Sequence, residues 1–87
     1  MSGASYSVSI KASAAKSLSR IPKPDRQRLV EAIDRLSEEP LAGGVLKGEF
    51  SGLRRLRVGV YRVVYEVVHE TVTVLVVRIG HRREVYR

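Results

Sequence analysis

Residues 53–66 constrain the fold of this chain most strongly, because they predict a β-hairpin. Two apolar and arginine-rich runs flank the dipeptide Gly59-Val60. Glycine as the first central residue of a two-residue loop supplies the positive φ that a type II′ turn needs. The turn also fixes the register of the two strands, since hairpin register follows from turn type and loop length.

The predicted register gives the hairpin two different faces. Arg57 lies opposite Arg62, and Arg55 lies opposite Val64, so the three arginines share one face. The other face is apolar and aromatic, and it carries Leu56, Val58, Tyr61, Val63 and Tyr65. We expect the apolar face to pack on the core and the arginine face to bind a polyanion, for which nucleic acid is the best candidate.

The distribution of charge supports this interpretation. The chain has a formal net charge of +7. Residues 53–87 hold eight basic residues, all of them arginine, and three acidic residues, whereas residues 1–52 hold eight basic and six acidic residues. Arginine binds phosphate through two parallel hydrogen bonds and stacks on bases, so its use here favours recognition of nucleic acid. A basic surface that only keeps the protein in solution is the alternative.

The length of 87 residues allows one domain, spanning residues 1–87, with one modest hydrophobic core. The chain contains no cysteine, no apolar run of membrane-spanning length and no signal-peptide pattern. We therefore expect a cytoplasmic protein that does not bind a membrane.

The order of the predicted elements indicates an α+β fold. Alternation predicts a first strand at residues 6–11, and helical spacing predicts two helices, one capped by Ser13 and one over residues 24–39. A glycine-rich loop follows, then the hairpin, and then a central Val-rich strand over residues 72–79 that Gly80 ends. The expected architecture is an antiparallel β-sheet meander of about four strands with the two N-terminal helices packed on one face.

The residue inventory favours chemistry without a metal or another cofactor. The nine acidic residues are scattered, the only histidines are His69 and His81, and no spacing matches a zinc site, a two-metal site or a serine nucleophile. Cleavage of RNA by its own 2′-hydroxyl is compatible with the chain, because it needs only a base, an acid and cations around the phosphorane. His81 is the residue best suited to proton transfer at neutral pH. A role for His81 in capping backbone groups is equally open.

Three stretches of the chain resemble the RelE branch of the RelE/ParE toxin superfamily. They are Leu46-Lys47-Gly48, the run Leu-Arg-Val-Gly-Val-Tyr-Arg-Val-Val-Tyr within residues 53–65, and Gly80-His81-Arg82-Arg83-Glu84-Val85-Tyr86. The resemblance covers nearly the whole chain, and the second and third stretches are fairly specific in combination. It implies a RelE-like fold and a toxin of a type II toxin–antitoxin system. Such a toxin is a ribosome-dependent endoribonuclease, or mRNA interferase, that cleaves messenger RNA in the ribosomal A site and inhibits translation.

The resemblance also implies roles for individual residues. Arg62 matches the arginine that stabilises the scissile phosphate, Arg82 matches the arginine proposed as general acid, and Tyr86 matches the tyrosine that positions the substrate. Arg55 stands where a well-known member has a lysine proposed as general base, and arginine is a poor proton acceptor. Either Arg55 only stabilises charge, or another group such as His81 is the base. The candidate RNA contacts are Lys47, Arg57 and Arg83.

The implied partners are a cognate antitoxin protein, with which the toxin forms a hetero-oligomer, and the ribosome with its mRNA. The alternative is a non-catalytic binding protein, either a ParE-like inhibitor of DNA gyrase or a degenerate toxin that only binds its antitoxin. The ending with Arg82 and Tyr86 favours the nuclease, because a gyrase inhibitor has no need of an arginine and a tyrosine that converge on a phosphate.

Overall fold

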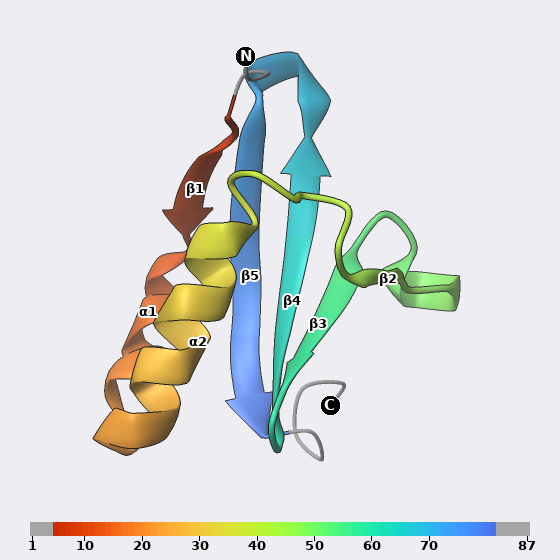
Figure 1. Ribbon diagram of the computed structural model, residues 1–87. Helices are drawn as coiled ribbons and strands as arrows, with labels where there is room; N and C mark the ends of the chain where they lie inside the picture. The colour runs from red at the N-terminus through yellow and green to blue at the C-terminus, as the bar shows by residue number, and fades with distance from the viewer. Residues whose placement is uncertain (1–4, 82–87) are drawn as a thin grey trace.

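The computed structural model describes residues 5–81. In this part of the chain, two helices pack with a five-stranded sheet of strand order β1-β5-β4-β3-β2 (Figure 1). The elements are β1 (Ser7–Ile10), α1 (Ala12–Ser19), α2 (Lys23–Arg35), β2 (Gly44–Val45), the short 3-10 helix η1 (Gly48–Phe50), β3 (Arg54–Val58), β4 (Tyr61–Val68), the 3-10 helix η2 (His69–Thr71) and β5 (Thr73–His81).

The sheet is mixed, not purely antiparallel. Strands β2 to β5 form the predicted antiparallel meander, but β1 pairs in parallel with β5. The expectation of about four antiparallel strands is therefore corrected to five strands, one of them a parallel edge strand. The periodicity of the sequence cannot show this pairing, because it joins Ser7 to Thr73 near the other end of the chain.

The last strand, β5, lies between β1 and β4, so its predicted central position is confirmed. Its predicted end at Gly80 was wrong. Gly80 pairs with Arg62 and His81 pairs with Tyr61, so the strand continues to the last described residue. A glycine weakens a strand but does not end it where a neighbouring strand offers hydrogen bonds.

The two helices differ from the prediction mainly at their ends. Pro24 lies in the first turn of α2, where its missing N–H is no loss, and Asp25 complements the helix dipole. α2 ends at Arg35, and turns continue the chain beyond it. The predicted cap at Ser13 was wrong, because Lys11, which follows β1 directly, takes the N-cap position with an extended ψ of 144°. Its side chain makes no capping hydrogen bond. No helix in residues 5–81 is long and apolar enough to cross a lipid bilayer.

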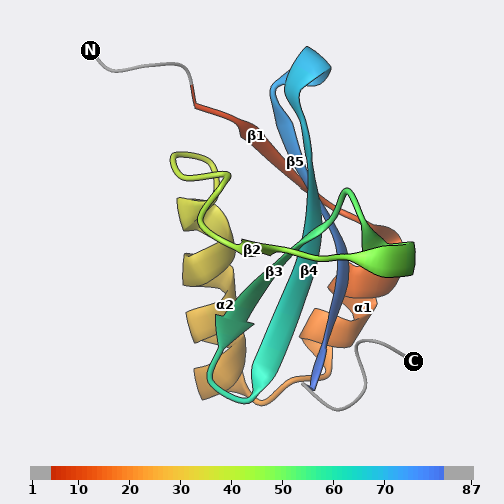
Figure 2. The same cartoon turned by 90° about the vertical axis from the view of Figure 1, so that its right-hand side faces the viewer.

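One hydrophobic core lies between the helices and one face of the sheet. α2 lies over this face, and α1 packs along the lower part of β5 (Figures 1 and 2). In Figure 2, α2 lies on one side of the sheet and η1 on the other. The helices therefore do not cover the second face of β3 and β4 (Figure 2), on which Val64 is nonetheless only 3% exposed. The side chains that are fully buried in the core are those of Leu29, Ile33, Leu36, Val63, Tyr65, Val74 and Val76.

Candidate functional site

The β3–β4 hairpin has the register predicted from its turn. Arg57 pairs with Arg62, and Arg55 lies two residues before Arg57 on β3. Gly59 has a φ of 61°, as the first central position of a type II′ turn requires. Val63 on β4 lies in the core, which is on the helix side of the sheet. Successive residues of a strand point to opposite faces, so Arg62 faces away from the helices. The predicted common face of Arg55, Arg57 and Arg62 is confirmed.

β5 adds a fourth arginine to this face. Arg78 pairs with Val64, which lies on the same side of β4 as Arg62. Sequence reasoning does not single out Arg78, because the run 72–79 has the composition of a buried strand. The charge of Arg78 within an apolar run indicates that its side chain reaches solvent. The sheet face to which it points depends on the pairing with β4 and on a register irregularity within that pairing. We call Arg55, Arg57, Arg62 and Arg78 the arginine surface.

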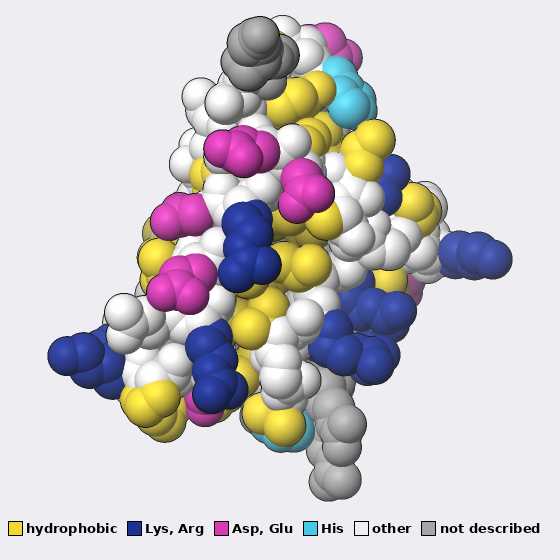
Figure 3. Space-filling model, in the orientation of Figure 1, with side chains coloured by type: hydrophobic (Ala, Val, Ile, Leu, Met, Phe, Trp, Pro, Cys, Tyr) yellow, Lys and Arg dark blue, Asp and Glu magenta, His cyan; other side chains and the backbone are white. Residues whose placement is uncertain are grey.

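The arginine surface concentrates positive charge on one face of the sheet. Like charges that lie directly opposite on neighbouring strands destabilise a sheet, and Arg57 lies opposite Arg62. Within residues 5–81, no ion pair engages Arg55 or Arg57. Figure 3 shows lysine and arginine side chains gathered beside β3, below the β2 loop. Such a cluster creates a positive potential that attracts polyanions.

His81 does not lie on the arginine surface. It pairs with Tyr61, and the two rings meet edge to face, with their centroids 6.2 Å apart. Tyr61 packs against the core, so both side chains lie on the helix side of the sheet. The structure therefore brings Arg55, Arg57 and Arg62 together on one face. His81, the candidate general base, lies on the opposite face.

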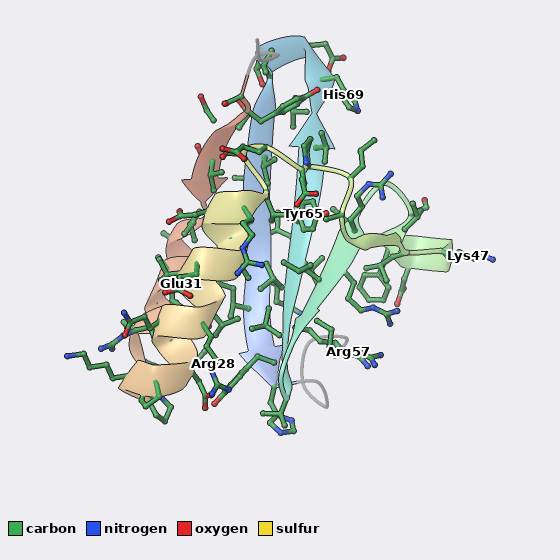
Figure 4. All side chains as sticks on the ribbon, in the orientation of Figure 1. Arg28, Glu31, Lys47, Arg57, Tyr65 and His69 are labelled. Atoms are coloured by element: carbon green, nitrogen blue, oxygen red, sulfur yellow. The ribbon has the colours of Figure 1, made fainter. Side chains whose placement is uncertain are left out.

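The remaining candidates lie elsewhere. Lys47 is exposed at the start of η1, and its side chain points outward on the same side of the molecule as Arg57 (Figure 4). Arg82, Arg83 and Tyr86 fall outside the residues that the structure describes.

Tyr65 ties the loop before β2 to the sheet (Figure 4). Its hydroxyl accepts a hydrogen bond of 2.8 Å from the N–H of Gly43 and donates one of 2.8 Å to the carbonyl oxygen of Pro40. The guanidinium of Arg54 donates to the carbonyl oxygens of Leu41 and Gly43, at 3.3 and 2.7 Å. We call this arrangement of Tyr65, Arg54 and the loop the loop clamp. It fixes the path of the chain into β2 and on to the loop that carries Lys47.

The loop clamp also perturbs the phenol. Burial raises the pKa of Tyr65 above its ordinary value, and the N–H of Gly43 and the charge of Arg54 offset only part of this effect. A neutral hydroxyl that both accepts and donates is the form that the two backbone partners need. Tyr65 is therefore a structural residue, as its place on the apolar face predicted.

Two hollows border the hairpin. One of about 320 Å³ lies between α2 and β3, and one of about 310 Å³ lies between the α1–α2 turn and the ends of β4 and β5. In residues 5–81, histidine and carboxylate side chains form no group of three or more that could hold a metal ion. The first hollow is lined by three arginines and two glutamates, and the second by one arginine together with Ser17, Tyr61 and His81.

The fold agrees with comparisons against known proteins. A family model described as the ParE toxin of the type II toxin–antitoxin system parDE matches residues 8–86. This chain belongs to the RelE/ParE superfamily of type II toxins. The toxin has the RelE-like α+β fold that its motifs predicted.

Individual relatives support the RelE branch. Toxin RelG of Mycobacterium tuberculosis is 36% identical over 84 residues, which cover 94% of this chain and 97% of RelG. The toxin–antitoxin complex RelBE2 of the same organism contains a chain with a TM-score of 0.84 and 34% identity, covering 90% of this chain and 99% of that chain. The archaeal RelE–RelB complex of Pyrococcus horikoshii gives a TM-score of 0.77 and 31% identity, covering 92% of this chain and 98% of that chain.

Proposed function

We propose that this toxin is a ribosome-dependent endoribonuclease that cleaves messenger RNA in the ribosomal A site and inhibits translation in the cytoplasm. The observation that carries the proposal is the arginine surface, in which Arg57 directly faces Arg62. Two guanidinium groups on neighbouring strands concentrate positive charge, which attracts a polyanion. Guanidinium groups bind a phosphodiester through paired, charge-assisted hydrogen bonds. The resemblance of the hairpin and the C-terminal motif to RelE toxins favours the same activity.

Cleavage proceeds by attack of an RNA 2′-oxygen on the adjacent phosphorus. The 2′-hydroxyl gives its proton to a general base, the bond from phosphorus to the 5′-oxygen breaks, and a general acid gives a proton to that oxygen. The products are a 2′,3′-cyclic phosphate and a 5′-hydroxyl, so the step needs no co-reactant. Arg62 and Arg55 stabilise the negative charge that develops on the phosphorane oxygens.

The other roles rest on the resemblance to the family. Arg82 is the proposed general acid, and Tyr86 positions the substrate. His81, at the end of β5, is the candidate general base. Because His81 and Arg62 lie on opposite faces of the sheet, the RNA must pass round the end of the sheet to bring a 2′-hydroxyl to the imidazole ring. Arg55 stabilises charge, because a guanidinium does not accept a proton at neutral pH. The further RNA contacts are Lys47, Arg57, Arg78 and Arg83.

Mapping of cleavage on programmed ribosomes tests the proposal. We expect the wild-type toxin to cut an mRNA in the A site, to leave a 2′,3′-cyclic phosphate, and to leave the same mRNA intact when it is free in solution. A single 2′-deoxynucleotide at the scissile position should block the cut, because it removes the nucleophile. Absence of cleavage on ribosomes, or equal cleavage of the deoxy-substituted message, contradicts the proposed chemistry.

We also propose that a cognate antitoxin binds this toxin in a hetero-oligomer. The RelBE2 and archaeal RelE–RelB structures are complexes of this kind. An acidic, amphipathic segment suits the arginine surface, since complementary charge favours association and register. Co-expression with the product of the neighbouring reading frame, followed by size-exclusion chromatography, should yield one complex. Elution of the toxin alone contradicts this pairing.

A second candidate function is inhibition of DNA gyrase, because the matching family model is described as a ParE toxin. A supercoiling assay with purified gyrase separates the two candidates. Inhibition of supercoiling by a toxin that leaves ribosome-bound mRNA intact favours the gyrase inhibitor. Unchanged supercoiling together with mRNA cleavage favours the nuclease.

A further inference from the structure

The hollow of about 310 Å³ lies on the other side of the sheet end from the arginine surface. The end of α1, the α1–α2 turn, the first residue of β4 and the last residues of β5 bound it. Its aromatic and polar lining consists of Ser17, Arg20, Tyr61 and His81. None of these residues lies on the arginine surface, so the hollow is a separate feature of the toxin.

The lining offers flat surfaces and a cation. The rings of Tyr61 and His81 meet edge to face, with an angle of 75° between their planes, and both residues are half-buried. Arg20 is exposed, and within residues 5–81 its guanidinium forms no ion pair or hydrogen bond. Unstacked bases of single-stranded RNA stack on aromatic rings and on guanidinium planes. The lining therefore suits a nucleobase.

The segment around the α1–α2 turn, residues 16–26, is basic. Residues 16–26 contain one acidic residue, Asp25, and its carboxylate is already 3.9 Å from the guanidinium of Arg28. Figure 3 shows lysine and arginine side chains at the lower end of the helices. This charge attracts a phosphate backbone and disfavours a basic partner. The four cations of residues 16–26 are Lys16, Arg20, Lys23 and Arg26, and of these Arg20 lines the hollow.

The hollow and the arginine surface meet at Gly80. This residue lines the hollow, and it pairs with Arg62 across β4 and β5. Successive residues of a strand point to opposite faces, so Tyr61 lies on the side of the hollow and Arg62 on the side of the arginine surface. A single strand of RNA that passes round this end of the sheet has a phosphate on one face and a base on the other.

We propose that the hollow binds one base of the RNA, beside the nucleotide whose phosphate lies on the arginine surface. The proposal rests on the nuclease function for the identity of the ligand, and it adds a base subsite formed by Arg20, Tyr61 and His81. Ring faces and a guanidinium plane accept every base, since each base has a π-face. The subsite therefore requires a base at this position but selects weakly among the four.

An abasic scan tests the subsite without any cleavage step. The probe is a fluorescent RNA of about five nucleotides, the low end of single-strand site sizes, so that it cannot shift its register freely. Fluorine replaces its 2′-hydroxyls, which prevents cleavage, and one base at a time is removed. We expect removal at one position to weaken binding by roughly tenfold, within the range of stacking energies, while removal elsewhere has less effect.

Variants then assign the sensitive position to the hollow. Ser17→Phe fills the hollow with a ring, and Arg20→Ala removes the guanidinium plane. In both variants, removal of the base at the sensitive position should weaken binding by less than about threefold. Lys16→Ala is the matched control, because it removes one charge of residues 16–26 outside the hollow and should weaken intact and abasic RNA equally.

Three results overturn the proposal. They are no binding of the probe, equal affinity of the wild-type toxin for every abasic probe, or a loss of affinity on base removal that is as large in both variants as in the wild type. Because the probe cannot be cut and no ribosome is present, a toxin that fails to cleave mRNA can still pass this test. Cleavage on ribosomes without any base-sensitive position refutes the subsite alone.

Discussion

Replacement of Tyr65 by phenylalanine removes one oxygen atom and leaves two backbone groups without their partner. The N–H of Gly43 is buried and the carbonyl of Pro40 is half-buried, and each lies 2.8 Å from the hydroxyl. A buried polar group without a hydrogen bond costs about 1–3 kcal/mol, and water reaches Pro40 more easily than Gly43. We expect the free energy of unfolding to fall by about 2–4 kcal/mol. For a domain of this size, the Tm should fall by roughly 10–25 °C.

Urea denaturation followed by circular dichroism measures this loss. Tyr61→Phe is the matched control, because the hydroxyl of Tyr61 has no hydrogen-bond partner within residues 5–81. The control should change the free energy of unfolding by no more than about 0.5 kcal/mol. The dependence on urea should keep its slope in both variants, since the surface exposed on unfolding is the same. A Tyr65→Phe toxin as stable as the Tyr61→Phe toxin refutes the loop clamp.

Three further predictions concern the loop clamp and the arginine surface. Burial raises the pKa of Tyr65, so the free energy of unfolding of the wild-type toxin should be constant below the ordinary tyrosine pKa of about 10. It should decline as the pH rises through the higher pKa of the folded state. The urea midpoint of Tyr65→Phe should decline less over the same pH range than that of the wild type. Gly43→Ala should cost more than about 2 kcal/mol in the same assay, because its Cβ meets the carbonyl oxygen of Arg55, whereas Gly44→Ala has open space and should cost under about 1 kcal/mol. Arg57→Ala should lower the slope of log affinity against log salt by about 0.7 for single-stranded RNA, and an unchanged slope contradicts a phosphate contact there.

The hairpin was predictable because its information is local. Gly59 at the turn fixes the register, and the register fixes which side chains share a face. The apolar stripe of α2 and the core position of Tyr65 were predictable for the same reason, since each depends on periodicity within one element.

The rest depends on contacts between distant parts of the chain. The parallel pairing of β1 with β5 and the face of Arg78 both require knowledge of which strands are neighbours. The position of His81 follows from a strand that continues through Gly80, where a local reading predicts a break. The partners of the Tyr65 hydroxyl lie in a loop whose path no periodicity describes.

The central claim is that the arginine surface binds and stabilises the scissile phosphate. Single-turnover cleavage of mRNA on programmed ribosomes tests it when wild-type toxin is compared with Arg62→Ala and with the control Arg28→Ala. The side chain of Arg28 is 73% exposed on α2, on the helix side of the sheet, where it lines the hollow between α2 and β3. We expect Arg62→Ala to slow cleavage by roughly 100-fold or more, as loss of a charge-stabilising group does, and Arg28→Ala to stay within about threefold of wild type. Equal rates for Arg62→Ala and wild type, with both proteins folded, contradict the claim.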